Sequence, residues 1–197
     1  MSPPAQQCDV VVIGAGMAGA SVAAFLAAHV RVAIIEREAL AGVHTTGRSA
    51  AMFMESYGPP QVRALTRASR HYLEQGPGWL RPRGALFIAR ASQAQALATL
   101  EAQLRTDGAD SGSLHRLTSA QALQQVPSLR PEAANSALLD TSAADIDVNA
   151  VHQHFLGCVR ALGSTIHLGV ALDTVRRDGA HWQVEAAGGR CWRAASS

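Results

Sequence analysis

Residues 9–36 read DVVVIGAGMAGASVAAFLAAHVRVAIIE, in which two apolar runs flank a glycine-rich turn and a segment of small residues. Gly14, Gly16 and Gly19 fit the pattern G-x-G-x-x-G directly after the first apolar run, and Glu36 ends the second run, 22 residues after Gly14. This order of strand, turn, helix, strand and acid is typical of a βαβ unit that binds a dinucleotide. The sequence therefore predicts an α/β fold with a Rossmann-like domain.

Each glycine and the acid have a physical task in such a unit. Gly14 lets the chain turn sharply out of the strand, Gly16 leaves room for a pyrophosphate, and Gly19 lets the helix pack closely on the sheet. The free N–H groups and the positive dipole end at the start of the helix suit phosphates. The carboxylate of Glu36 can accept hydrogen bonds from ribose hydroxyls and would repel a ribose phosphate, which argues against NADP and leaves FAD or NAD.

Composition excludes several other classes of protein. The chain has 197 residues, 48% of them hydrophobic, and a formal net charge of +2 that comes from interspersed Lys and Arg, so we expect a solid core and no nucleic-acid partner. The apolar stretch near the N-terminus lacks a basic leader and is interrupted by glycines, so it predicts neither a signal peptide nor a transmembrane segment. Cys8, Cys158 and Cys191 lack C-x-x-C spacing, which indicates reduced thiols and favours a cytoplasmic location.

The segment after Glu36 carries many small donors and one guanidinium. Thr45, Thr46 and Ser49 offer hydroxyl groups, and Arg48 can stabilise negative charge on a phosphate or on a reduced flavin. A polar surface turn is the alternative to a cofactor loop. The position of the segment, directly after the acid of the dinucleotide unit, favours the cofactor loop.

The chain resembles the FAD-dependent oxidoreductases of the D-amino-acid oxidase superfamily, and within it the D-amino-acid dehydrogenases of the D-arginine dehydrogenase type. The motifs that carry the resemblance are VIGAGMAGAS, IIERE, GVHTTGRSAA, YGPPQVRALTRASR at 57–70, ADIDVNAVHQHFL at 144–156 and RRDGAHWQVEAAGG at 176–189. The resemblance implies FAD as the cofactor. It also implies a small-molecule substrate, a D-amino acid or a related amine, oxidised at its Cα–N bond by hydride transfer to flavin N5.

The resemblance further implies a set of site residues. Tyr57 lies where the group has a substrate-site tyrosine, the alternative being a half-buried tyrosine beside a turn. Met52 departs from the group, because related dehydrogenases can carry a histidine there and a thioether cannot relay protons. The implied cofactor-binding residues are Gly14, Gly16, Met17, Ala18, Gly19, Glu36, Arg37, His44, Thr45, Thr46, Gly47, Arg48, Ser49, Ala50, Ala51 and Val170, the last through its backbone.

The chain is expected to divide into three segments. These are the N-terminal part of an FAD-binding domain with an incomplete sheet at 1–78, part of an α+β substrate domain at 79–146, and a return to the FAD-binding domain at 147–197. Residue patterns predict helices at 61–73, 93–105, 119–123 and 148–162 and strands at 84–89 and 137–139. The resemblance implies a strand at 165–175 and a hairpin at 181–194.

Three further groups of residues are assigned no chemistry. His152 and His154 are two positions apart on a predicted helix and point to different faces, so we expect packed or solvated histidines and no metal site. Asp145 and Asp147 are explained by turn formation and helix capping. The segment 80–92 contains no acid to hold a cationic substrate side chain, so the sequence does not support specificity for D-arginine.

Members of the resembled group continue beyond the sequence CWRAASS, so we expect an N-terminal half that needs a further C-terminal half for activity. The alternative is a non-catalytic remnant that binds adenine dinucleotide weakly or not at all. An NAD-dependent dehydrogenase is disfavoured, because the HTTGRSAA loop suits a flavin and no later nicotinamide-side motif follows.

Overall fold

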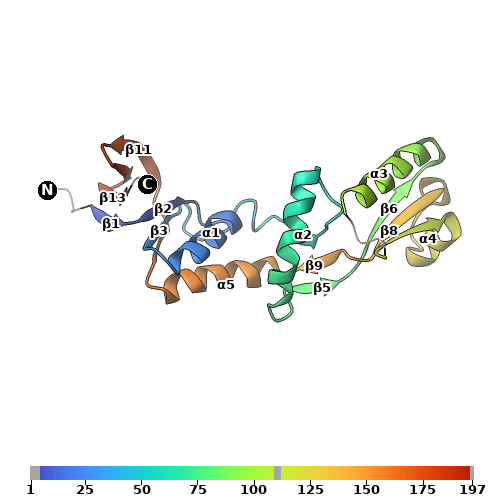
Figure 1. Ribbon diagram of the computed structural model, residues 1–197, viewed down its shortest axis with the longest axis horizontal. Coiled ribbons are helices and arrows are strands. Elements are labelled where there is room, and N and C mark those ends of the chain that lie inside the picture. Colours follow the sequence, from blue (N-terminus) through green and yellow to red (C-terminus); the bar gives the residue numbers. More distant parts are fainter. Residues whose placement is uncertain (1–4, 109–111, 196–197) are drawn as a thin grey trace. The chain divides into compact units, whose positions relative to one another are not determined.

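The computed structural model of the protein describes residues 5–108 and 112–195. The chain forms two compact units, and Figure 1 labels most of their helices and strands. The first unit joins the described residues up to Ala50 with those from Val148 onward, and the second is Ala51–Asp147. The domain boundaries expected from the sequence stay a prediction, because compactness alone does not show which segments hold a cofactor or a substrate.

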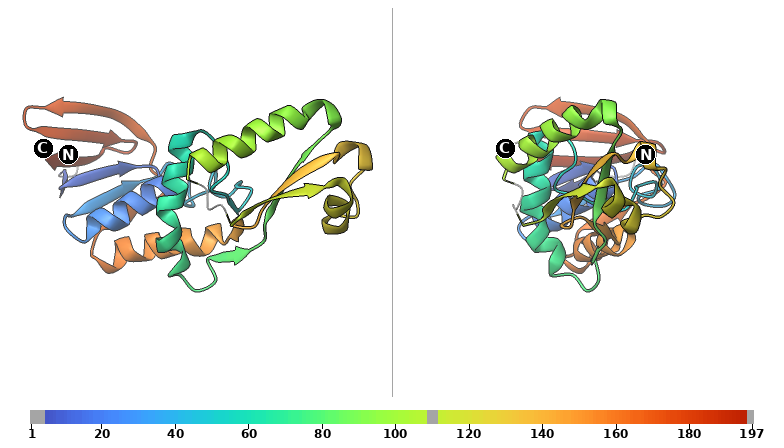
Figure 2. Two further views of the ribbon diagram at one scale, coloured as in Figure 1. Left: turned by 45° about the vertical axis from the view of Figure 1, so that its right-hand side comes forward. Right: turned by 90° about the vertical axis from the view of Figure 1, so that its right-hand side faces the viewer.

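The first unit contains a parallel sheet with the strand order β10-β3-β2, formed by Thr165–His167, Val32–Ile35 and Val10–Ile13. All four residues of β3 are buried, as expected for a run of Val, Ala and Ile in a parallel strand. Helix α1 (Met17–Ala27) connects β2 to β3, and α5 (Val148–Ala161) packs beside α1, as Figures 1 and 2 show. The predicted α/β fold and its βαβ unit are confirmed.

A second sheet completes this unit and encloses its core. Its order is β1-β13-β12-β11, formed by Gln6–Cys8, Arg190–Ala195, His181–Ala186 and Leu172–Asp178. Strands β12 and β13 form the predicted hairpin. Residues of both sheets and of the segment between β10 and β11 make one buried apolar cluster, which consists of Cys8, Ala33, Ile35, Val170, Val184, Ala186, Trp192 and Ala194.

The expected single strand at 165–175 is wrong. Strand β10 ends at His167, and β11 begins at Leu172 in the other sheet. Between them Gly169 has φ +65°, a left-handed conformation that interrupts an extended strand. The N–H groups of Gly169 and Val170 donate to the carbonyl oxygens of Glu38 and Glu36, both at 2.8 Å, so the break ties this segment to the end of β3.

The second unit contains two antiparallel sheets with the strand orders β4-β9-β5 and β6-β8-β7. The elements of this unit are β4 (Met52–Phe53), α2 (Pro60–Glu74), β5 (Leu80–Pro82), β6 (Ala85–Ala89), the 3-10 turn Ala91–Gln93, α3 (Ala94–Thr106), β7 (Leu114–Thr118), α4 (Ser119–Gln125), the 3-10 turn Pro131–Ala133, β8 (Ser136–Asp140) and β9 (Ala144–Ile146).

Most elements predicted from the sequence are confirmed. In the second unit, the helices predicted at 61–73, 93–105 and 119–123 are α2, α3 and α4, and the strands predicted at 84–89 and 137–139 are β6 and β8. In the first unit, the helix predicted at 148–162 is α5.

Local sequence signals account for two features of this unit. Leu97 and Leu104 lie on the same face of α3 and pack with Leu138 of β8, which explains why α3 covers that sheet. Thr118 caps α4, because its hydroxyl accepts the Gln121 N–H at 3.3 Å while the Gln121 side chain accepts the Thr118 N–H at 2.9 Å. Among the residues that the structure describes, no helix combines the length and the apolar character that a membrane crossing requires.

A pH dependence of stability follows from His167 in the first unit. Its ring meets that of Trp192 edge to face, with 5.1 Å between centroids. Burial, and then the positive charge of Arg190, lower the pKa of His167 below its ordinary value of about 6.5. As the pH falls, the His167 ring therefore takes up its proton in the unfolded chain before it does so in the folded chain. The stability that the neutral His167 ring contributes above about pH 6.5 is lost on acidification.

We expect the wild-type chain to lose more unfolding free energy between about pH 7.5 and about pH 5 than the variant His167→Gln does. Urea unfolding followed by circular dichroism at several pH values measures both losses. Equal losses in the two proteins would contradict this assignment.

Candidate cofactor site

The glycine-rich turn between β2 and α1 has the geometry that its sequence predicts. Gly14 has φ +99°, a region that only glycine adopts at low cost, and its N–H donates to the Ile35 carbonyl at 2.8 Å. A Cβ on Gly19 would lie 1.9 Å from the carbonyl oxygen of Gly14. The first turn of α1 thus lies directly against the backbone of the loop, which only a glycine at position 19 allows.

Glu36 stands at the carboxyl end of β3 and reaches the same turn. Its Oε2 accepts the Ala15 N–H at 2.8 Å, and its Oε1 accepts the Glu38 N–H at 3.0 Å. Each carboxylate oxygen keeps a further lone pair for another donor. The acid is therefore ordered in the place where a dinucleotide-binding fold presents a carboxylate to ribose hydroxyls.

The start of α1 faces a loop from later in the chain. Gly16, the N-cap residue, supplies no capping side chain, and the Met17 N–H donates instead to Thr46 Oγ1 at 2.9 Å. A Cβ on Gly16 would lie 3.2 Å from the same Oγ1. Ala18, in the first turn, is exposed. The structure therefore brings the loop hydroxyl to the helix end that is suited to an anion.

The loop itself is a series of turns over residues 41–48, held by its own backbone. The Gly47 N–H donates to the Gly42 carbonyl at 2.7 Å, and the Arg48 N–H to the His44 carbonyl at 3.1 Å. Thr45, Gly47, Arg48, Ser49 and Ala50 are exposed.

Ala51 lies three residues beyond the turns at 41–48 and is the first residue of the second unit. Its φ of +54° is the only positive φ of a non-glycine residue in the described part of the chain. Such a conformation costs alanine about 1–2 kcal/mol, so the backbone at Ala51 is strained.

The side chains of Arg37, Glu38 and His44 gather at the beginning of the loop. His44 Nε2 lies 2.8 Å from Glu38 Oε1, and Arg37 Nε donates to the same oxygen at 3.0 Å. The hydrogen bond from His44 is the main cause that lowers the pKa of Glu38 below its ordinary value. Arg37 and His44, both predicted cofactor residues, are thereby linked to each other through Glu38.

Val170 lies beside Glu36, as its N–H donates to the Glu36 carbonyl. Its side chain is buried in the core of the first unit. A backbone contact between Val170 and an adenine would therefore have to use its carbonyl oxygen.

The predicted substrate-site residue belongs to the second unit. Tyr57 precedes α2, is 69% exposed, and donates its backbone N–H to the Met54 carbonyl at 3.4 Å. Met52 lies in β4, paired in register with Asp145 of β9. The role of Tyr57 stays a prediction.

One residue beside the turn was assigned no chemistry from the sequence and is a packed histidine. His152 on α5 is only 3% exposed, and its Nε2 lies 2.8 Å from the carbonyl oxygen of Ala15. The spacing of Val151, Phe155 and Val159 could have placed His152 on the buried face of its helix, because these apolar residues recur at helical intervals beside it. His154 is exposed and lies near Cys158, with 3.6 Å between Nε2 and Sγ.

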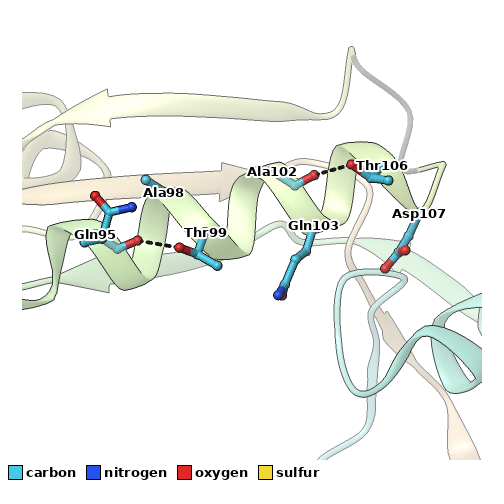
Figure 3. Close-up of a pocket in the computed structure, with 7 residues that line it drawn as sticks. All are labelled: Gln95, Ala98, Thr99, Ala102, Gln103, Thr106 and Asp107. Atoms are coloured by element: carbon cyan, nitrogen blue, oxygen red, sulfur yellow. Dashed lines mark hydrogen bonds between the residues drawn. The ribbon is translucent and has the colours of Figure 1, made fainter.

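A hollow of about 400 Å³ lies along α3 in the second unit (Figure 3). The hydroxyls of Thr99 and Thr106 donate to carbonyls of their own helix, as the dashed lines in Figure 3 show. The carboxylate of Asp107 pairs with Arg63, whose side chain is buried. None of the predicted site residues lines this hollow, and its lining offers a phosphate no cation. Within the described residues, no cluster of His, Cys, Asp and Glu could hold a metal ion.

Comparisons with solved structures agree with this geometry. The chain matches L-alpha-glycerophosphate oxidase from Mycoplasma pneumoniae with FAD bound (TM-score 0.84, 14% identity, 93% of this chain and 50% of that one). It also matches glycine oxidase from Geobacillus kaustophilus (TM-score 0.79, 22% identity, 96% and 54%) and L-proline dehydrogenase from P. horikoshii (0.82, 17%, 98% and 52%). The chain therefore shares their fold and spans about half of their length.

The family of the chain follows from a match over almost its whole length. Residues 9–195 match the model of the family described as FAD dependent oxidoreductase, whose cofactor is FAD. This range contains the glycine-rich turn, Glu36, the loop at 41–48 and Val170. The chain belongs to the FAD dependent oxidoreductase family.

Proposed function

We propose that this chain is the FAD-binding part of an oxidoreductase that oxidises the Cα–N bond of an amino acid or a related amine, with D-amino acids as substrates. The observation that carries the proposal is the turn in which Gly19 packs on Gly14 while Glu36 accepts the Ala15 N–H. This arrangement leaves the start of α1 available to a pyrophosphate and holds a carboxylate at the end of β3.

The residues present fit FAD. The Gly16 N–H would hold the pyrophosphate, Met17 would act through Thr46, which accepts its N–H, and Glu36 would hold the adenosine ribose. Thr46 keeps its hydroxyl hydrogen for a phosphate oxygen, because it accepts the Met17 N–H and does not need to donate there. The exposed guanidinium of Arg48 would stabilise negative charge on the cofactor. When bound, FAD supplies the acceptor for a hydride, since flavin chemistry belongs to the cofactor and the protein positions it.

The proposed reaction removes a hydride from the substrate Cα and a proton from its amine, which leaves an imine. Water then hydrolyses the imine to a carbonyl compound and ammonia. Two of the matched structures are named for glycine and L-proline, which supports an amino acid as the substrate class. Preference for the D-enantiomer rests on the sequence resemblance, as does Tyr57 as the substrate-site residue.

The experiment that tests this function is anaerobic reduction of the FAD-loaded chain by amino acids in the presence of the complementary C-terminal half of the resembled enzymes, followed by the visible absorbance of the flavin. We expect bleaching by a neutral D-amino acid and none by its L-enantiomer, with the achiral amino acid glycine as a further candidate. Dithionite serves as the positive control for a reducible flavin. Bleaching by dithionite but by no amino acid, with both halves present, would contradict amine oxidation while leaving FAD binding intact.

Two expectations from the sequence remain part of the proposal. The cytoplasm is the proposed compartment. A complementary polypeptide corresponding to the remaining half of the resembled enzymes is the proposed requirement for turnover, and addition of such a half to the loaded chain tests it. A folded chain that retains no FAD would instead favour the non-catalytic alternative.

A further inference from the structure

His152 is the one buried histidine that the structure places against the glycine-rich turn among the residues described. Its ring lies on α5, 137 residues away from Ala15, and its Nε2 is 2.8 Å from the Ala15 carbonyl oxygen. A carbonyl oxygen can only accept, so Nε2 must carry the hydrogen. His152 therefore donates a hydrogen bond to the residue between the first two glycines of the motif.

Ala15 is held on both sides. Its N–H donates to Glu36 at 2.8 Å, and its carbonyl accepts from His152 at 2.8 Å. Ala15 itself is fully buried, so no solvent replaces either partner. An unpaired carbonyl in this buried position would be costly, so the peptide has one strongly preferred orientation.

The orientation of this peptide determines where the Gly16 N–H points. In a planar trans peptide the carbonyl of one residue and the N–H of the next point in opposite directions. Because His152 draws the Ala15 carbonyl toward α5, the Gly16 N–H points away from α5. A rotated peptide would instead direct a carbonyl oxygen toward a bound phosphate and repel it.

The same ring supports the second cofactor segment. A Cβ on Gly42 would lie 2.8 Å from Cε1 and 3.1 Å from Nδ1 of His152. Gly42 has φ +76°, and its carbonyl accepts the Gly47 N–H that closes the loop. His152 thus lies between the glycine-rich turn and the loop at 41–48.

We propose that His152 is a positioning residue of the cofactor site, which fixes the Ala15–Gly16 peptide so that the Gly16 N–H faces the pyrophosphate. This inference rests on the proposed FAD binding and adds to it a residue outside the family's glycine motif and acidic position. Its role is exerted through the backbone of the turn and requires the Nε2–H donor rather than the volume of the ring alone.

The test compares two substitutions at position 152 by their dissociation constants for FAD and for ADP, a probe that contains the pyrophosphate without the flavin. His152→Leu keeps most of the volume and removes the donor, whereas His152→Gln can present an amide N–H near the position of Nε2. We expect His152→Leu to raise the dissociation constants of both ligands by about tenfold or more. Without the donor the Ala15–Gly16 peptide loses its orientation, and with it the hydrogen bond from the Gly16 N–H to the charged pyrophosphate is lost. We expect His152→Gln to restore most of that loss.

Two control variants on the same helix separate positioning from general destabilisation. His154→Leu changes an exposed histidine two positions away, and Val159→Ala removes buried volume without touching the turn. Both should bind FAD and ADP like the wild type, once the folded fraction measured by urea unfolding is taken into account. An equal loss in His152→Gln and His152→Leu, a comparable loss in Val159→Ala, or a loss confined to FAD would overturn the proposal.

A wild-type chain that binds neither FAD nor ADP would contradict the proposed function, and the inference is then decided in the cofactor-free protein. Nitrogen-15 NMR of the His152 ring distinguishes its two neutral tautomers. The Nε2–H tautomer supports the hydrogen bond to Ala15, and the Nδ1–H tautomer overturns it.

Discussion

The Gly19→Ala substitution is expected to reduce FAD affinity by about 100-fold or more, because the added Cβ would meet the Gly14 carbonyl oxygen at 1.9 Å. That oxygen belongs to a backbone that cannot easily yield, since the Gly14 N–H is bonded to Ile35 and the turn requires φ +99°. Either the helix or the turn must move, and both contribute to the surface that receives the pyrophosphate. Overpacking of this kind also lowers the unfolding free energy by about 1–3 kcal/mol.

The matched control for this substitution is Gly157→Ala on α5. A Cβ at position 157 meets no atom within 4 Å, so the change only replaces glycine inside a helix. It should raise the unfolding free energy by about 1 kcal/mol and leave FAD affinity unchanged. Quenching of flavin fluorescence and urea unfolding measure both quantities. A Gly19→Ala protein that binds FAD as tightly as the wild type would show that the close approach of α1 to the turn is not required.

Trp192→Ala is expected to have the largest effect on stability, about 3–5 kcal/mol. Trp192 has no exposed surface and is the largest fully buried side chain among the described residues. It joins both sheets of the first unit through a cluster that includes Ile35, which precedes Glu36 in the chain, and Val170, whose N–H donates to the Glu36 carbonyl. Loss of this side chain should therefore weaken FAD binding together with the fold of the unit.

Two comparisons make the Trp192 prediction specific. Trp182 lies on the neighbouring strand β12 and is 43% exposed, so Trp182→Ala should cost no more than about 1 kcal/mol. The indole Nε1–H of Trp192 is buried and has no partner among the described residues, so Trp192→Phe removes an unsatisfied donor and should cost clearly less than Trp192→Ala. Equal losses for Trp182→Ala and Trp192→Ala in urea unfolding would contradict the location of the core.

The βαβ unit could be predicted because its signals are local. The spacing of Gly14, Gly16 and Gly19 after an apolar run specifies the turn, and four consecutive buried residues of β3 follow from their apolar side chains. The helices of both units follow from apolar residues at helical intervals in the same way.

Contacts between distant segments could not be predicted from these signals. The hydrogen bond between Met17 and Thr46 joins residues 29 positions apart, and that between His152 and Ala15 joins residues 137 positions apart. The division of 165–175 into two strands depends on bonds from Gly169 and Val170 to the end of β3, which no local pattern reveals. Apolar periodicity could have placed His152 on a buried face, but its partner is known only from the fold.

The most direct test of the central claim is whether the purified chain retains FAD. The chain is incubated with an excess of FAD and passed through gel filtration, and the visible absorbance of the protein fraction is recorded beside that of Gly19→Ala. We predict a flavin spectrum that elutes with the wild-type chain and is absent from the variant. A wild-type chain that is folded by circular dichroism and elutes without flavin would contradict the account.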